Sequence, residues 1–177
     1  MIAHESVSDR PPTVRQMLDL MLSEREEWDD LLDRLGEPRM ELAGLAGDWS
    51  VKDLIAHITW FEREMVTLIR ERTLNGSELW LLPPDERNAA IYREYRHLSI
   101  HEVLAESRQV FASLDSAVQT LSDADLIDPS RFTDMPPDWE PWRIIADNSY
   151  AHYMDHKKAL GAWVDKLDNQ AESCANF

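Results

Sequence analysis

Apolar residues recur at steps of three and four over four long segments of this chain, and this spacing constrains its fold most. The segments run from about residue 13 to 35, 50 to 73, 99 to 122 and 141 to 168. Such spacing places an apolar stripe along one side of an α-helix, and no segment reads convincingly as a strand. Helices of this kind bury their stripes against one another, which predicts an all-α fold, an antiparallel four-helix bundle.

Helix-ending residues lie between these segments. Gly36 and Pro38 end the first of them, as is typical of residues at and beyond a helix C-terminus. A short accessory helix is expected at about 85–97, packed across one end of the bundle. Four prolines between residues 125 and 141 predict an irregular crossover, because proline interrupts both helices and central strands.

The length of 177 residues is sufficient for a single domain with its own core. We expect residues 13–168 to form the bundle, residues 1–12 a disordered N-terminal leader and residues 169–177 a flexible tail. The one cysteine, Cys174, excludes an intrachain disulfide. A reducing, cytoplasmic location is therefore expected.

The formal net charge of −16, from 34 acidic and 18 basic residues, restricts the partners of the chain. A field of this sign repels phosphate backbones and anionic lipid surfaces, so we expect neither a nucleic-acid nor a membrane partner. No stretch approaches the roughly 20 apolar residues of a membrane span, and the N-terminus lacks the apolar core of a signal peptide. A small-molecule substrate is the expected partner, and bundles of this size are compatible with a homodimer.

Two histidines occupy positions of the last long segment where a bundle normally places leucines. His152 and His156 are four residues apart on the apolar seam, so their rings share one helical face. His57 lies on the apolar side of the second segment, three residues after Leu54 and four before Phe61. Buried imidazoles need polar partners. Either carbonyls or carboxylates satisfy the three rings, or they bind one divalent metal and leave a coordination position open.

Further candidates for substrate contact lie near these histidines in the helical pattern. Asn148 lies one turn before His152 and is a candidate to hydrogen-bond a substrate or a metal-bound water. Glu64, seven residues after His57, is a candidate base, with a solvated helix face as its alternative. Four aromatic residues are expected either to shape a substrate pocket or to fill the core, namely Trp60, Tyr92, Trp142 and Tyr153.

The chain resembles the DinB-like superfamily of four-helix bundle proteins in the segments GDWSVKDLIAHITWFEREM and NSYAHYMDHKKALGAW. The stretch DERNAAIYREYRHLSIHEVLAE is similar to the middle of the ClbS/DfsB-type branch. The resemblance extends from about residue 14 to 164. It implies that His57, His152 and His156 bind a divalent metal, as the corresponding histidines typically do in DinB-like proteins. Relatives include metal-dependent thiol transferases, a thiol-dependent isomerase and a genotoxin hydrolase that does not depend on this histidine trio.

These observations favour a metal-dependent enzyme that adds a thiol or water to a small electrophile, as a thiol S-transferase or a hydrolase. The expected cofactors are zinc or nickel and a low-molecular-weight thiol, because a bound cation lowers the pKa of such a nucleophile. One alternative is a non-enzymatic bundle that binds and sequesters an apolar compound. Another is a metal-independent resistance hydrolase of the ClbS type, since fold resemblance alone does not select a reaction.

Overall fold

The computed structural model describes residues 10–175, and within that range the chain is helical apart from its connecting segments. The elements in chain order are α1 (Val14–Leu35), α2 (Glu37–Met40), α3 (Val51–Glu71), η1 (Glu78–Leu81), α4 (Pro84–Tyr95), α5 (Ile100–Val118), α6 (Asp123–Ile127), η2 (Pro129–Arg131), α7 (Pro141–Asp147) and α8 (Tyr150–Ala175). The described range contains no strand, and the expected all-α bundle is confirmed. Residues 1–9 of the expected leader lie outside the described part.

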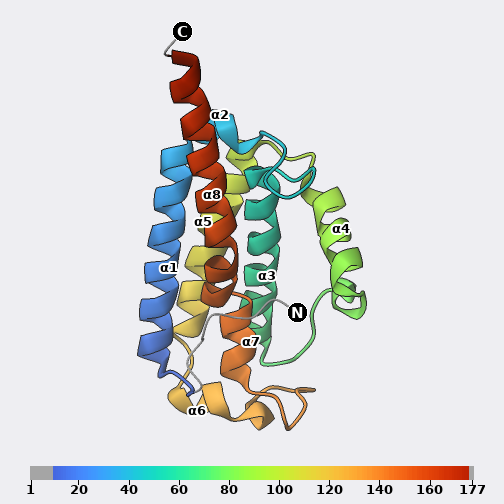
Figure 1. Cartoon of the computed structure of the whole chain (residues 1–177). Coiled ribbons are helices and arrows are strands. Elements are labelled where there is room, and N and C mark those ends of the chain that lie inside the picture. The colour runs from blue at the N-terminus through green and yellow to red at the C-terminus, as the bar shows by residue number, and fades with distance from the viewer. Residues whose placement is uncertain (1–9, 176–177) are drawn as a thin grey trace.

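The long helices lie side by side in two directions (Figure 1). α1 and the α7–α8 pair run one way, and α3 and α5 run the other way. The α4 segment carries the chain back between α3 and α5, so these two neighbours are parallel. Among the described residues, no helix is long and apolar enough to cross a membrane.

Four helices begin at a residue that satisfies one of their first backbone N–H groups. The N-caps of α1, α3, α5 and α6 each accept a hydrogen bond from the backbone three residues on, and the side chain at that position accepts one in return; they are Thr13, Ser50, Ser99 and Ser122. This reciprocal arrangement is the capping box. At the other end of α1, Gly36 has a φ of 76°, a conformation that glycine adopts without steric strain.

The accessory helix lies along α3 and not across an end of the bundle, which corrects the position expected from the sequence (Figure 1). Trp60 and Phe61 give α3 an apolar surface outside the bundle core, and Ile91 of α4 is buried against them at 1% exposure. Because apolar surface is most stable away from water, α4 covers this second apolar face of α3.

The last long segment is split into two helices, where one continuous helix was expected. α7 ends at Asp147 and α8 begins at Tyr150. Between them, the Asn148 side chain donates to the Ile144 carbonyl oxygen at 2.7 Å, and the Ser149 hydroxyl donates to the Ile145 carbonyl oxygen. Side chains that bond to nearby carbonyls compete with the helical hydrogen bonds, which explains the break.

The C-terminal end of α8 differs from the expected tail. The helix continues to Ala175, and therefore occupies most of residues 169–177. Residues 176–177 and the side chain of Cys174 lie outside the described part.

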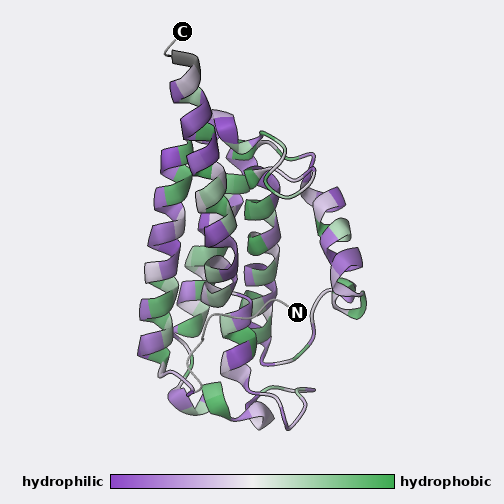
Figure 2. Ribbon diagram, viewed as in Figure 1, coloured by the Kyte–Doolittle hydropathy of each residue, from purple (hydrophilic) through white to green (hydrophobic). Residues whose placement is uncertain are grey.

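Apolar positions face inward along the bundle and polar positions face outward (Figure 2). The core consists of two main clusters, one toward the α6–α7 end and one toward the α2 end. At the α6–α7 end the Pro-rich crossover contributes buried Leu126, Phe132 and Met135. The backbone of Thr73 also pairs with that of Thr133. The crossover is thus irregular, as predicted, and closes one end of the core.

Candidate metal centre

The three histidines predicted as ligands come together in the structure. His57 comes from α3, whereas His152 and His156 come from successive turns of α8. One ring nitrogen from each lies within 4.8 Å of the others. The Nε2 atoms of His57 and His152 are 3.1 Å apart. Residues nearly a hundred positions apart in the chain therefore converge on one point.

The spacing and chemistry of these nitrogens fit a divalent cation. Two nitrogens that each lie about 2.0–2.1 Å from a tetrahedral zinc are separated by roughly 3.3 Å, close to the distance between His57 and His152. The Nδ1 atoms of these two rings are buried and have no hydrogen-bond partner among residues 10–175. Neither Nδ1 atom is therefore satisfied by a carbonyl or a carboxylate of the described range. The alternative to metal binding requires such partners.

Burial keeps the three imidazoles neutral. Burial, together with the charges of His156 and Arg87, lowers the pKa of His57 to about 3. Burial also lowers the pKa of His152, and to a lesser extent that of His156, where the Asp155 carboxylate opposes it. Neutral imidazole is the form that binds metal ions, so the rings need not lose a proton at neutral pH to do so.

Aromatic rings hold the histidines in place. The Phe61 ring lies 4.9 Å from that of His57 and 4.8 Å from that of His152, in edge contacts with both. Trp49, from the loop before α3, contacts His57 at 5.5 Å and stacks on Tyr92 of α4. Trp49 and Phe61 were not predicted as site residues, although Trp49 belongs to the GDWS motif that precedes α3.

The four aromatic residues predicted to shape a pocket separate into two pairs. Tyr92 is connected to the site through Trp49, on which its ring stacks. Trp60 contacts Phe61, with 4.8 Å between the ring centres. Trp142 instead belongs to the core cluster toward α6, where it is 0% exposed. Tyr153 is 1% exposed and its hydroxyl donates to Glu62. Trp142 lies on α7, before the helix that carries the histidines, and Tyr153 lies one position after His152 and therefore on another side of α8.

Glu64 and Asn148 lie in a separate groove. It has a volume of about 650 Å³ between the end of α3, η1 and α7, and its lining includes Glu64, Leu81, Trp139 and Asn148. Glu64 Oε2 accepts hydrogen bonds from the Ser77 backbone N–H at 2.8 Å and the Trp80 indole N–H at 2.7 Å. Trp80, which lines the groove, also contacts Phe61, with 5.5 Å between the ring centres. The groove is therefore connected to the histidines through two aromatic rings.

A buried polar chain crosses the core beside the centre. Arg25 of α1 donates to the Tyr153 hydroxyl at 3.2 Å, and this hydroxyl donates to Glu62 of α3 at 2.7 Å. Glu62 is 0% exposed, and burial raises its pKa to about 7 although Tyr153 and Arg25 oppose the shift. No sequence pattern selected this network, because its members lie on three helices.

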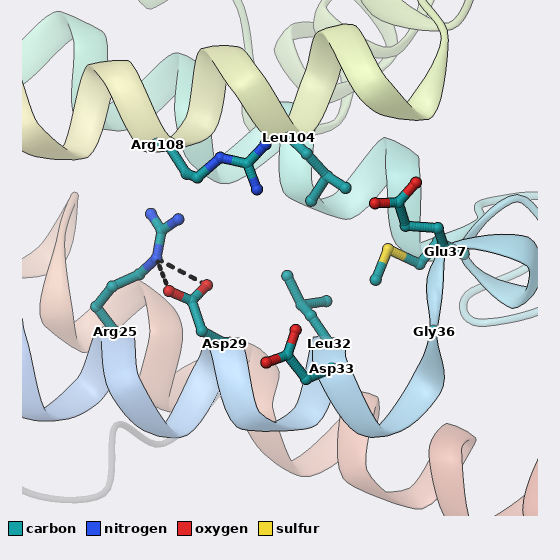
Figure 3. Close-up of a pocket in the computed structure, with 9 residues that line it drawn as sticks. Arg25, Asp29, Leu32, Asp33, Gly36, Glu37, Leu104 and Arg108 are labelled. Carbon is teal, nitrogen blue, oxygen red and sulfur yellow. Dashed lines mark hydrogen bonds and ion pairs between the residues drawn. The ribbon is translucent and has the colours of Figure 1, made fainter.

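Arg25 also reaches a cavity between α1 and α5, with a volume of about 270 Å³. Figure 3 shows Arg25 beside Asp29, with Arg108 extending from α5 toward the same space. The Arg25 Nε donates to both oxygens of Asp29 at 2.9 Å. Its charge is thus neutralised by a carboxylate in the same cavity.

Solved structures share this fold at low sequence identity. A protein from Streptococcus pneumoniae has a TM-score of 0.74 at 15% identity, covering 90% of this chain and 94% of that one. The structure titled Sibling Lethal Factor Precursor – DfsB also gives 0.74 at 15% identity, covering 89% and 98%. The colibactin self-resistance protein ClbS, solved in complex with a dsDNA, gives 0.68 at 16% identity, covering 89% and 96%. No protein with a curated description matches.

The sequence profile of the DinB superfamily matches residues 24–160, a range that contains all three histidines of the candidate centre. This match covers more than half of the chain and agrees with the helical bundle and with the fold of the solved structures. The chain belongs to the DinB superfamily.

Proposed function

We propose that this protein is a metal-dependent enzyme that adds a thiol or water to a small electrophilic substrate. The observation that carries the proposal is the convergence of three ring nitrogens within 4.8 Å of one another. Two protein features support it further: the buried Nδ1 atoms of His57 and His152 have no partner in the described range, and burial lowers the pKa of all three imidazoles. Zinc and nickel suit such a nitrogen donor set.

The chain's own residues prepare the site for this chemistry. His57, His152 and His156 would hold the cation, and three protein ligands leave a coordination position for an exchangeable group. A bound divalent cation lowers the pKa of a coordinated water or thiol toward neutrality. Phe61 covers one side of the histidine cluster through edge contacts with His57 and His152. Glu64 and Asn148, in the adjoining groove, are proposed to orient the part of the substrate that extends beyond Trp80.

Metal binding is tested on untagged protein purified without chelators. We expect mass spectrometry to detect close to one equivalent of zinc or nickel, and calorimetry to give a dissociation constant for each metal. His152→Ala should lose at least about 100-fold in affinity, because it removes one of three ligands. His101→Ala is the matched control, since the His101 side chain is 79% exposed and lies outside the cluster. Equal metal binding by parent and His152→Ala contradicts the proposal.

Turnover is tested separately with a panel of small electrophiles in the presence of glutathione, cysteine or water alone. We expect loss of activity in His152→Ala and after removal of metal, and recovery when zinc or nickel is returned. Activity that is unchanged by removal of metal would instead favour a resistance hydrolase of the ClbS type. The shared fold with ClbS over 89% of this chain supports that second candidate.

Sequestration of an apolar compound is the third candidate. The 650 Å³ groove favours it, because Trp80, Trp139 and the 86% exposed Leu81 offer apolar surface to a ligand. Thermal shifts induced by an apolar ligand that persist after metal removal, without turnover, would support this function.

The proposed enzyme needs no second copy of the chain, because one chain supplies all three histidines. Light scattering would establish whether the expected homodimer forms.

A further inference from the structure

An arginine on the accessory helix lies beside the histidine cluster with its charge uncompensated. The Arg87 guanidinium carbon of α4 is 5.6 Å from the centre of the Phe61 ring and 4.7 Å from that of Trp80. Phe61 is the same ring that contacts His57 and His152. Arg87 and the two histidines therefore flank one phenyl ring, and the Arg87 charge is near enough to lower the pKa of His57.

Arg87 combines a buried donor with the absence of a carboxylate partner. Within residues 10–175, no acidic side chain forms an ion pair with Arg87, and its buried Nε has no hydrogen-bond partner. The chain carries 34 acidic residues against 18 basic ones, so acidic partners are plentiful. Many other arginines of the described range do pair with carboxylates, among them Arg25, Arg34, Arg39, Arg63, Arg72, Arg131 and Arg143.

The contacts with the two rings leave the Arg87 guanidinium without a hydrogen-bond partner among residues 10–175. Aromatic rings attract a guanidinium through its face, whereas a carboxylate is bound through the N–H groups along its edge, often by two parallel hydrogen bonds. Phe61 and Trp80 thus hold the Arg87 group without using its donors for another protein group. Partial burial lowers the pKa of Arg87, but an arginine keeps its charge in proteins. The Nε–H of Arg87 is buried without a partner, and such a donor is costly unless an acceptor binds to it.

We propose that Arg87 binds the carboxylate of an anionic substrate, with the apolar body of that substrate lying against the half-buried Trp80. This inference rests on the proposed function and deepens it, since it assigns a substrate class to the same centre: small carboxylates with an electrophilic group. The carboxylate lies on the α4 side of Phe61, and the reacting group lies on the histidine side. Arg87 acts in binding and in orientation, and takes no part in a covalent step.

The test compares two probes that differ only in charge, 3-phenylpropionate and 3-phenylpropanamide. Protein freed of metal on a chelating resin is used, so that the carboxylate cannot bind to a cation in place of Arg87. Dissociation constants come from NMR chemical-shift titrations of the indole N–H signals. We expect the wild-type protein to bind the carboxylate at least about tenfold more tightly than the amide, the effect of one charge-assisted hydrogen-bonded pair.

The variants then assign this preference to one side chain. Arg87→Gln should bring the ratio of the two dissociation constants close to one, and Arg87→Lys should leave it intermediate because lysine keeps the charge but loses the planar edge. Arg93→Gln, an exposed arginine on the same helix, is the matched control and should keep the wild-type ratio. A wild-type protein without preference, or Arg87→Gln with the full preference, overturns the proposal. If Arg87→Gln fails to fold, Arg87→Lys decides: a ratio equal to that of the wild type overturns the proposal.

Metal binding, measured by calorimetry on the same preparations, separates this inference from the proposed function. Carboxylate preference in a protein that binds no metal would contradict the metal-dependent enzyme and support the Arg87 site. Metal binding without carboxylate preference would contradict the Arg87 site alone.

Discussion

Tyr153 and Glu62 are joined by a 2.7 Å hydrogen bond inside the bundle, although 91 positions separate them in the chain. The Tyr153 hydroxyl also accepts a hydrogen bond from Arg25. One oxygen atom therefore connects α1, α3 and α8 directly beside the turn that carries His152.

Replacement of Tyr153 by phenylalanine should destabilise the protein by about 1–3 kcal/mol, since it leaves two buried polar groups without that partner. Urea denaturation followed by circular dichroism measures this change. The control is Tyr92→Phe, at a half-buried tyrosine, which should alter the free energy of unfolding by no more than about 0.5 kcal/mol. Equal effects of the two substitutions would argue against an energetic role for the buried hydroxyl.

Glu62 should make stability depend on pH. Its pKa is raised to about 7 in the folded protein, chiefly by burial, from an ordinary value of 4.5. The folded state therefore binds the proton more tightly, so this contribution to stability is fully present below about pH 4.5 and is lost as the pH rises through 7. Between pH 4.5 and 8, wild-type stability should fall relative to Glu62→Gln by about 3 kcal/mol. Parallel pH profiles of the two proteins would refute this assignment.

Phe61 should control metal affinity by packing. The buried Nδ1 atoms of His57 and His152 have no hydrogen-bond partner in the described range, so the contacts with Phe61 replace the usual orienting hydrogen bond. We expect Phe61→Leu to weaken zinc binding about tenfold in competition with a chromogenic chelator. Phe111→Leu, beneath Arg25 and away from the histidines, should leave zinc affinity unchanged. A Phe61→Leu protein with wild-type affinity would show that the rings are held by other contacts.

Two glycines offer a matched pair of substitutions. A Cβ at Gly76 would lie 2.5 Å from Glu64 Oε2 and 2.9 Å from the Trp80 ring, whereas one at Gly161 meets nothing within 4 Å. Gly76→Ala should destabilise the protein by about 1–3 kcal/mol, because Glu64 is fixed by its hydrogen bonds to the η1 loop. Gly161→Ala, within α8, should stabilise it by about 0.5–1 kcal/mol. Thermal denaturation of both variants provides the comparison.

Double-stranded DNA should bind weakly if at all, even though ClbS was solved with a dsDNA. The net charge of −16 repels the phosphate backbone, and nonspecific binders typically reach dissociation constants of about 0.1 mM or tighter only through basic contacts. Fluorescence anisotropy with a labelled duplex at physiological salt should give no saturation below about 0.1 mM. Micromolar binding would show that local basic residues outweigh the overall charge.

The sequence was sufficient to predict the helices and the three candidate ligands. Apolar spacing reports which residues of a helix face inward, so it placed His57, His152 and His156 on core-facing stripes before any contact was known. It predicted Tyr153 less well, because a shift of one position along α8 turns a side chain by about 100°. That rotation directs the hydroxyl to Glu62 in the core, away from the metal centre.

Other features depend on contacts between distant segments. The Arg87 environment arises only when α4 packs along α3, and no local pattern predicts that placement. The break at Asn148 accompanies two hydrogen bonds, from the side chains of Asn148 and Ser149 to the carbonyl oxygens of Ile144 and Ile145. Spacing alone did not reveal it, since the apolar positions continue in register across the break.

The position of α4 outside the bundle separates two properties of the centre. The histidines belong to α3 and α8, whose inner faces build the core, while Arg87 and Tyr92 belong to a helix held to α3 by a small aromatic cluster. Substitutions at the exposed positions of α4 can therefore accumulate at little cost to folding, and a duplicated gene could acquire a new substrate preference there while its ion-binding chemistry is inherited intact.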